Sequence, residues 1–301
     1  MDYVLLKAGS FVLVILLGYA LKRFHFFGEG DYKVMTKIAI NVTLPAAVIT
    51  SFASFQRDDS LFILVLLGLG LNFVMILFGF LASLGKNKRL RSFFMMCCPG
   101  YNIGSFTLPF VQNFFGAFGV VATCMFDVGN SLMCTGGTYT IASAAVGGGS
   151  EKMGPKQILK RLFTSVPFDT YLLMLLLTLV QIKIPEPVVT LSSTIAAANG
   201  FCAMMMMKVE FKKSYLKAVG TTLLIRYLCA GALSAFFYFC SPFSLQIRQV
   251  LAIVVFAPVS ALAPAFTEKL KGDHGLASFA GSVSIIISIA IMTVLMIVMH
   301  I

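Results

Sequence analysis

The chain has 301 residues, of which 58% are hydrophobic and only 12% are charged, and its formal net charge is +11. Soluble globular domains carry roughly 25% charged residues, so this composition excludes an ordinary soluble domain and indicates a polytopic membrane protein. The positive charge does not indicate nucleic-acid binding, because the basic residues alternate with apolar runs and do not gather on one stretch that could form a single face.

Ten apolar runs approach the roughly 20 residues that an α-helix needs to cross a bilayer. They lie at residues 4–21, 34–54, 61–83, 93–114, 117–141, 167–182, 188–207, 217–240, 249–267 and 276–299. The first run is expected to stay in the protein, because its basic pair Lys22 and Arg23 follows the apolar segment, whereas a signal peptide carries its basic residues before it. The predicted fold class is therefore an all-α membrane protein with ten transmembrane helices.

The connections between these runs alternate in charge. Every odd-numbered connection is basic, through Lys22, Arg23, Lys86, Lys88, Arg89, Arg91, Lys152, Lys156, Lys160, Arg161, Lys208, Lys212, Lys213, Lys217, Lys269 and Lys271. The even-numbered connections are poor in Lys and Arg, and one of them pairs Arg57 with Asp58 and Asp59. The positive-inside rule then places both termini outside. We expect a multi-pass protein of the cell (inner) membrane.

Helix-breaking residues interrupt the fourth span. From Cys98 to Gly116 the sequence reads CPGYNIGSFTLPFVQNFFG. Pro109 lacks an N–H group and clashes with the preceding turn, so the helix is expected to break between Pro99 and Pro109. Irregular backbone is tolerated at membrane depth only where protein or a water-filled cavity covers it. The break therefore predicts a cavity faced by two half-helix ends, as in secondary transporters.

Charged residues inside the predicted spans are the next candidates. Asp127 is the only carboxylate deep in any span, and it is followed by Asn130. Insertion of such a charge costs roughly 2.5 to 3.5 kcal/mol, which makes it a functional candidate by default. Arg226 lies at a similar depth in the eighth span, so a structural ion pair between Asp127 and Arg226 is the alternative.

The chain divides into two similar halves. A charged, glycine-rich segment at residues 147–165 predicts a cytoplasmic linker between a first five-helix repeat, residues 1–146, and a second, residues 166–301. Helix breakers recur at one offset of 155 residues, which relates Pro45 to Gly200 and Pro109 to Pro264. An odd number of spans in each half gives inverted repeats, with the broken spans four and nine crossing at the midplane. Pro258 is the second breaker expected in span nine.

Several motifs together resemble the auxin efflux carrier family, bacterial branch. They are NVTLPA in span two, the N-x6-P spacing of Asn102 to Pro109 followed by QNFFG, and the pair Asp127 and Asn130. A fourth motif is span nine, which contains Pro258 and is followed by a small basic loop and a serine-rich final span. The resemblance covers nearly the full length. It implies the inverted-repeat fold shared with bile acid sodium symporters and some sodium/proton antiporters, built from a scaffold-like part and a mobile part.

The resemblance also implies a substrate class and a site. Family members move organic anions, such as auxin in plants and malate- or malonate-type dicarboxylates in bacteria. Asn102 would contact the substrate, and Pro109 and Pro264 would be the crossover prolines. Two departures suggest a reshaped site: Thr107 stands where the family has glycine, and Asn199-Gly200-Phe201 stands where it has proline.

These observations predict a secondary transporter that holds a small organic anion by helix N-terminal amides at the crossover. The expected substrate-binding residues are Asn102, Thr107, Pro109, Asn41, Asn199, Ser260 and Pro264. Movement linked to protons through Asp127, or driven by the membrane potential, is favoured over sodium symport, because the mid-membrane carboxylates are too few for a sodium cage. A sodium-coupled symporter and a substrate-sensing receptor on the same fold stay open as alternatives.

Other classes are less consistent with the sequence. An enzyme is not expected, because His25, His274 and His300 lie at span ends or in loops, away from any intramembrane nucleophile or zinc set. The seven cysteines show no metal-ligand spacing, so neither a metal nor another cofactor is predicted. The expected partners are the organic anion, the lipid bilayer and protons. A homodimer stays open, since Gly136, Gly137 and Gly231 could pack within one chain or between two.

Overall fold

A computed structural model describes residues 2–26, 28, 31–54, 61–147, 154–205 and 215–300. Some sequence predictions fall outside these residues: the charges at Arg57, Asp58 and Asp59, the basic residues Lys152, Lys208, Lys212 and Lys213, and residues 148–153 of the predicted linker. The described part of that linker contains a short helix, α8 (Pro155–Leu162).

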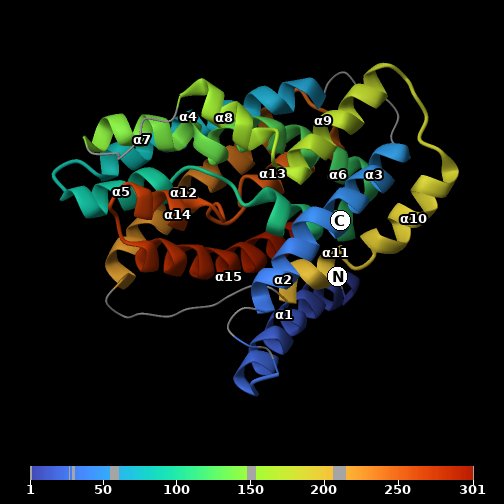
Figure 1. Cartoon of the computed structure of the whole chain (residues 1–301), viewed down its shortest axis with the longest axis horizontal. Coiled ribbons are helices and arrows are strands. Elements are labelled where there is room, and N and C mark those ends of the chain that lie inside the picture. Colours follow the sequence, from blue (N-terminus) through green and yellow to red (C-terminus); the bar gives the residue numbers. More distant parts are fainter. Residues whose placement is uncertain are drawn as a thin grey trace.

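The described residues are almost entirely helical (Figure 1). The first half contains α1 (Asp2–Arg23), α2 (Asp31–Ile38), η1 (Ala39–Thr43), α3 (Leu44–Ala53), α4 (Phe62–Ala82), α5 (Lys88–Cys97), η3 (Ile103–Thr107), α6 (Leu108–Leu132), η4 (Met133–Gly137) and α7 (Thr138–Val146). The second contains α9 (Val166–Leu179), α10 (Glu186–Ala196), α11 (Asn199–Met205), α12 (Leu216–Ala235), η6 (Phe236–Cys240), α13 (Leu245–Val254), α14 (Ala263–Lys269) and α15 (His274–Val298). The elements labelled η are π-helical turns.

In the described part of the chain, five helical segments are long and apolar enough to cross a membrane: Val34–Ala53, Phe62–Ala82, Ile103–Val146, Leu216–Cys240 and His274–Val298. The chain is therefore an all-helical, multi-pass membrane protein. The other predicted spans correspond to shorter or interrupted helices, such as α9, the pair α10 and α11, and the pair α13 and α14. Within α6, Gly116 has φ 60° and ψ −153°, which ends one arm of the helix between the runs predicted at residues 93–114 and 117–141.

Pro99 and Pro258 lie in non-helical segments, as predicted, whereas Pro45 and Pro109 do not break the helix. Pro45 and Pro109 both lie in the first turn of a helix, α3 and α6, and each directly follows a π-helical turn, η1 or η3. The wider turn removes the demand for the N–H that proline lacks. The true interruption in span four is earlier, at Cys98–Asn102. In span seven the helix turns at Ala197 and Ala198, so Gly200 lies inside α11.

The helices form two packed groups, which we call the first and second bodies. The first body contains α1, α2, α3, α9, α10 and α11, in which α3 packs against α9 and α10, and α1 packs against α11. The second body contains α4, α5, α7, α12, α13, α14 and α15, with α6 packed against α4 and α13. In Figure 1, α10 and α5 lie at opposite ends of the molecule. Helix α6 also contacts α3 and α9, so it lies on the boundary.

Glycine allows α4 and α6 to pack unusually closely. A Cβ added to Gly68 would lie 2.0 Å from the carbonyl oxygen of Phe126, and one added to Gly129 would lie 2.0 Å from that of Val65. Small residues permit such backbone contact between membrane helices. The contact fixes the position of Asp127, which lies between Phe126 and Gly129.

Candidate functional site at the crossing of two interrupted helices

The two interrupted helices meet at their unwound segments. Between α5 and η3 the chain is unwound at Cys98–Asn102, and between α13 and α14 it is non-helical around Ala257–Ser260. Tyr101 and Val259 form an antiparallel bridge, and the Asn102 amide donates to the Pro258 carbonyl at 2.9 Å. Gly100 has φ +80°, and a Cβ there would lie 2.9 Å from Ser260 Cβ. Glycine is therefore needed for both backbone conformation and space at this point.

Two asparagines hold the first unwound segment. Asn72 on α4 accepts a hydrogen bond from the Gly100 amide at 2.8 Å and donates to Asn130 Oδ1 at 3.1 Å. Asn130 on α6 accepts from the Tyr101 amide and donates to the Tyr101 carbonyl. Side chains thus supply the partners that the broken helix lacks, as burial of a polar backbone requires.

Serine side chains on α15 hold the second unwound segment. Ser284 Oγ accepts a hydrogen bond from the Val259 amide at 3.0 Å, and Ser288 donates to the Phe256 carbonyl at 2.6 Å. Tyr227 on α12 donates its hydroxyl to the Ser284 carbonyl at 2.8 Å. The serine-rich final span therefore serves as the backbone partner of the ninth span.

Arg226 lies where the two unwound segments begin. Its guanidinium donates to the carbonyls of Cys97, Cys98 and Pro99 at the end of α5, and to those of Ala257 and Pro258 after α13. The C-terminal end of a helix carries partial negative charge, so one buried cation compensates two helix ends. Arg226 also stacks over the Tyr101 ring, with 5.4 Å from Cζ to the ring centroid. Among the described residues, Arg226 and Asp127 do not form an ion pair. The structural ion pair that the sequence left open is therefore not observed.

A cavity of about 130 Å³, which we call the crossing cavity, opens beside the unwound segments. The polar residues that line it are Asn102, Ser105, Asp127, Asn130, Ser131, Cys134, Thr135, Ser165, Tyr171 and Ser260. Ile40, Leu44, Ser165 and Tyr171 come from the first-body side of the boundary, and the crossing segments come from the second. The cavity therefore lies between the two bodies.

Asp127 and Tyr171 face each other in this cavity. Asp127 is 6% exposed, and its Oδ1 accepts a hydrogen bond from Asn130 Nδ2 at 2.8 Å. A Cβ added to Gly104 would lie 3.9 Å from Asp127 Oδ2 and 3.5 Å from the Tyr171 hydroxyl oxygen. That hydroxyl is buried and interacts with the Asp127 carboxylate.

The start of η3 also faces the cavity. Asn102 is the residue before η3, its carbonyl accepts from the Thr107 amide and hydroxyl, and Gly104 and Ser105 follow in the cavity wall. The amides of the first turn of a helix have no partner within the helix and carry partial positive charge. The cavity thus combines a helix start with a carboxylate and a tyrosine hydroxyl.

The predicted substrate residues do not all reach the crossing cavity. Asn102 and Ser260 line it, as do Asp127 and Asn130. The remaining predicted residues lie elsewhere: Thr107 is buried and bonded to Asn102, Asn41 is exposed and bonded to Lys37 of its own helix, and Pro109 and Pro264 occupy the first turns of α6 and α14. Asn199 is buried between Thr43 and Gln112, to which it is hydrogen-bonded at 3.0 and 3.2 Å.

Sequence reasoning missed Tyr171, Ser284 and Ser288. Each lies in a span that reads as apolar, and each acts on a segment far away in the sequence. A polar side chain in the middle of an apolar span was the available signal, since burial of such a group requires a partner. The sequence does not say which partner.

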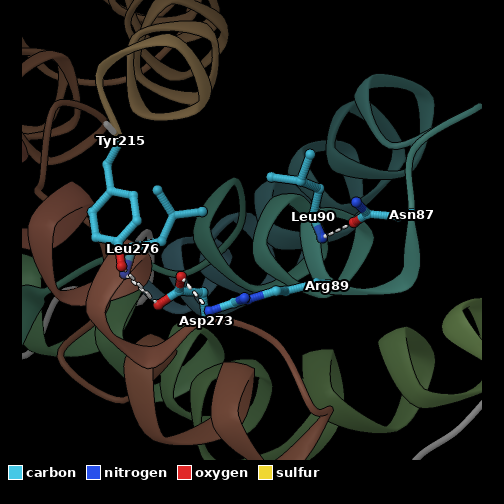
Figure 2. Close-up of polar contacts among 6 residues, drawn as sticks. All are labelled: Asn87, Arg89, Leu90, Tyr215, Asp273 and Leu276. Atoms are coloured by element: carbon cyan, nitrogen blue, oxygen red, sulfur yellow. Dashed lines mark hydrogen bonds and ion pairs between the residues drawn. The ribbon is translucent and has the colours of Figure 1, made fainter. Parts of the chain in front are cut away.

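A second polar cluster joins the starts of three helices in the second body (Figure 2). Asp273 precedes α15 and accepts hydrogen bonds from the Leu276 amide at 3.0 Å and the Tyr215 hydroxyl at 3.3 Å. It also forms an ion pair with Arg89, at 2.8 Å, on α5. Burial raises the pKa of Asp273, but the Leu276 amide, the Tyr215 hydroxyl and the Arg89 charge lower it more, so its pKa lies below the usual value.

Comparisons with known proteins give one informative likeness. No family model matches the chain. The chain is 29% identical over 170 residues to a protein of Methanothermobacter thermautotrophicus that is named "Uncharacterized transporter", and the match covers 54% of each chain. The chain therefore spans about half the length of this curated relative.

Proposed function

We propose that the chain is a secondary active transporter of small organic anions that binds its substrate in the crossing cavity and works by alternating access. The observation that carries this proposal is the position of the cavity, at the boundary of two helix bodies and beside two interrupted helices. Transporter sites are built from discontinuous helices near the bilayer midplane. The likeness to a protein named as a transporter supports the same class.

The proposed architecture has ten spans in two inverted five-helix repeats, residues 1–146 and 166–301, with both termini outside. An interrupted helix in each half and the antiparallel bridge between Tyr101 and Val259 support it. Segments that cross in opposite directions are what an inverted repeat would bring together. The resemblance to the auxin efflux carriers predicts the same arrangement.

The proposed substrates are carboxylates, such as malate-type dicarboxylates or auxin-like acids. The start of η3 favours an anion, because Gly104 and Ser105 line the cavity and the amides at the start of a helix carry partial positive charge. Asn102 and Ser260 would add hydrogen bonds from the two crossing segments. A larger hollow of about 770 Å³ lies between α3, α9 and α10. It is a weaker candidate, because neither of the unwound segments at the crossing lines it.

The arrangement of Arg226 favours proton-linked or potential-driven movement over sodium symport. A sodium site at the crossing would draw on unwound carbonyls, and Arg226 already donates to those of Cys98, Ala257 and Pro258. Asp127 remains outside this network of the arginine, in the cavity, where it can exchange a proton with substrate or water.

Transport by the purified chain in liposomes tests the proposal. Counterflow of a labelled organic acid is expected for the wild type, and Asn102→Ala should lower it at least tenfold. Asn41→Ala is the matched control, because this asparagine is exposed and bonded within its own helix. Equal loss in both variants would remove Asn102 from the binding site. Binding without any flux would contradict a carrier and favour a sensor.

A further inference from the structure

A chain of three hydrogen-bonded side chains joins the first body to α6. Asn199 on α11 is 1% exposed, and its Oδ1 accepts a hydrogen bond from the Thr43 hydroxyl on η1 at 3.0 Å. Its amide nitrogen donates to Gln112 Oε1 on α6 at 3.2 Å. Helix α6 lies on the boundary between the two bodies. The bond between Asn199 and Gln112 is therefore a polar contact between the first body and the helix that follows η3.

The first-body side of this contact is held in place. Because Asn199 Oδ1 accepts from Thr43, the amide nitrogen of Asn199 is directed toward Gln112. Helix α11 packs directly on α1, where a Cβ added to Gly18 would lie 2.7 Å from the Met205 carbonyl oxygen. A shift of α6 relative to the first body therefore has to break the bond between Asn199 and Gln112, since Asn199 cannot follow without leaving its own neighbours.

Two cavities lie next to this chain of side chains. Leu44, which follows Thr43, lines the crossing cavity, and so does Ser165 at the end of the predicted cytoplasmic linker. Gln112 lines a second cavity of about 300 Å³ between α1, α6, α10 and α11, which we call the outer hollow. Gln112 lies about one turn before Gly116, where the chain enters the fourth connection, which the predicted topology places outside. The contact thus lies between a cavity on the linker side and a cavity toward the outer side.

The contact can open without leaving a buried polar group unpaired. Buried amide groups need a hydrogen-bond partner, and in the closed contact Asn199 and Gln112 supply one to each other. Gln112 is only partly buried and lines the outer hollow. Water that enters from the hollow can replace the lost partner, because a water-mediated hydrogen bond is nearly as favourable as a direct one. The pair is therefore suited to a contact that closes and opens repeatedly.

We propose that the bond between Asn199 and Gln112 is a gate that closes the crossing cavity toward the outer hollow. It stabilises the state seen here, in which the crossing cavity borders the linker side, and access from the outer side requires the bond to break. Asn199 and Gln112 are positioning residues, since neither lines the crossing cavity. This inference rests on the proposed transport function and names the contact that controls access to its site.

A native cysteine can report which side of the membrane reaches the crossing cavity. Cys134 lines this cavity and is partly exposed. The full-length chain is used with Cys229→Ser and Cys240→Ser, because these two are the other cysteines that are not buried. A membrane-impermeant maleimide is added to right-side-out and to inside-out vesicles, and modified Cys134 is quantified by peptide mass spectrometry. Cys134 should react faster in inside-out vesicles.

Three variants test the gate in the same background. Gln112→Leu removes the acceptor at similar size and should raise the reaction of Cys134 from the outside about threefold to tenfold, as expected for one hydrogen bond. Gln112→Glu keeps an acceptor oxygen and should stay near the wild-type rate. Asn113→Leu is the matched control, because Asn113 lines the same hollow but donates to the Pro109 carbonyl of its own helix.

A second variant covers the case in which Gln112→Leu does not fold. Thr43→Val keeps the shape of the side chain and removes the hydroxyl that orients Asn199. It should raise the reaction of Cys134 from the outside as well. The melting temperature of each variant shows whether it is folded.

The outcomes separate the gate from the proposed function, because labelling does not depend on a substrate. Unchanged labelling in folded Gln112→Leu, or an equal rise in Asn113→Leu, would overturn the gate and leave a carrier standing if counterflow persists. Equal reaction of wild-type Cys134 from both sides would show that the contact is not closed. Labelling that shifts as expected, in a chain without flux of any acid tested, would keep the gate and overturn the carrier.

Discussion

Arg226 and Asp127 show how two charges can occupy one membrane interior without pairing. Arg226 is surrounded by carbonyl oxygens of two helix ends. Asp127 is paired with Asn130 and faces the cavity. A buried guanidinium with several acceptors is stabilised by charge-assisted hydrogen bonds, so the arginine is committed to the backbone and the aspartate is left available to a substrate.

Replacement of Arg226 should therefore affect folding more than chemistry. Arg226→Met removes the donor of the Cys98 and Ala257 carbonyls, at about 1–3 kcal/mol for each unpaired buried group. The Pro258 carbonyl would keep the Asn102 amide as its donor. We expect a large fall in melting temperature in detergent. Arg248→Met is the control, since Arg248 donates to one carbonyl, that of Tyr238. Similar melting temperatures for the two variants would show that Arg226 does not hold the crossing.

At the scale of elements, close backbone contacts and helix ends determine the geometry of the site. Helices α4 and α6 touch through Gly68 and Gly129, and α4 also carries Asn72, which holds the unwound segment. The pair of helices thus carries both the partner of the interruption and the carboxylate of the cavity. A change in their separation would alter both at once.

Gly68→Ala tests this contact, and Gly70→Ala on the same helix is the matched control. The added methyl of Gly68→Ala would lie 2.0 Å from the Phe126 carbonyl oxygen, whereas a Cβ on Gly70 meets nothing within 4 Å. Overpacking costs about 1–3 kcal/mol, so Gly68→Ala should lower the melting temperature and weaken acid binding. Gly70→Ala should leave both nearly unchanged. Loss of binding in Gly70→Ala alone would contradict the packing argument.

The Asp273 cluster ties three helix starts and predicts a dependence of stability on pH. Because the folded pKa of Asp273 is lowered, its contribution is present above the unfolded value of about 3.9 and is lost as the pH falls through the folded pKa. Asp273→Ala should cost about 1 kcal/mol through the lost helix cap. Melting temperatures of the variant and wild type should differ equally from pH 7 to pH 5 and converge only below about pH 4. Convergence already between pH 7 and pH 5 would contradict this assignment.

For the whole molecule, the sequence predicted the helical class and the two interrupted regions, because charge, hydropathy and helix breakers are local properties. It misplaced the break toward Pro109, since a π-helical turn accommodates this proline and Pro45 alike. It could not show that Asn41 is exposed whereas Tyr171 lines the crossing cavity. Whether a polar residue faces lipid or a cavity depends on contacts between helices far apart in the chain, such as α9 against α6.

The topology of the whole chain can be measured by labelling single cysteines from each side of the membrane. Lys88 lies on a basic connection and Lys183 on a connection poor in basic residues, and both are exposed. With the exposed Cys240 replaced by serine, Lys88→Cys should react only from the inside and Lys183→Cys only from the outside. Reaction of both from one side would exclude the proposed arrangement of ten spans.

The position of the crossing cavity between two bodies has a consequence for handling the protein. A ligand that contacts both bodies binds the assembled chain and not separated or unfolded parts, so by mass action it stabilises the fold by RT ln(1 + [L]/Kd). At one hundred times the dissociation constant this is about 2.7 kcal/mol. An acid that fits would therefore protect the chain against heat and protease, so candidate ligands can be ranked in detergent before any vesicle is made.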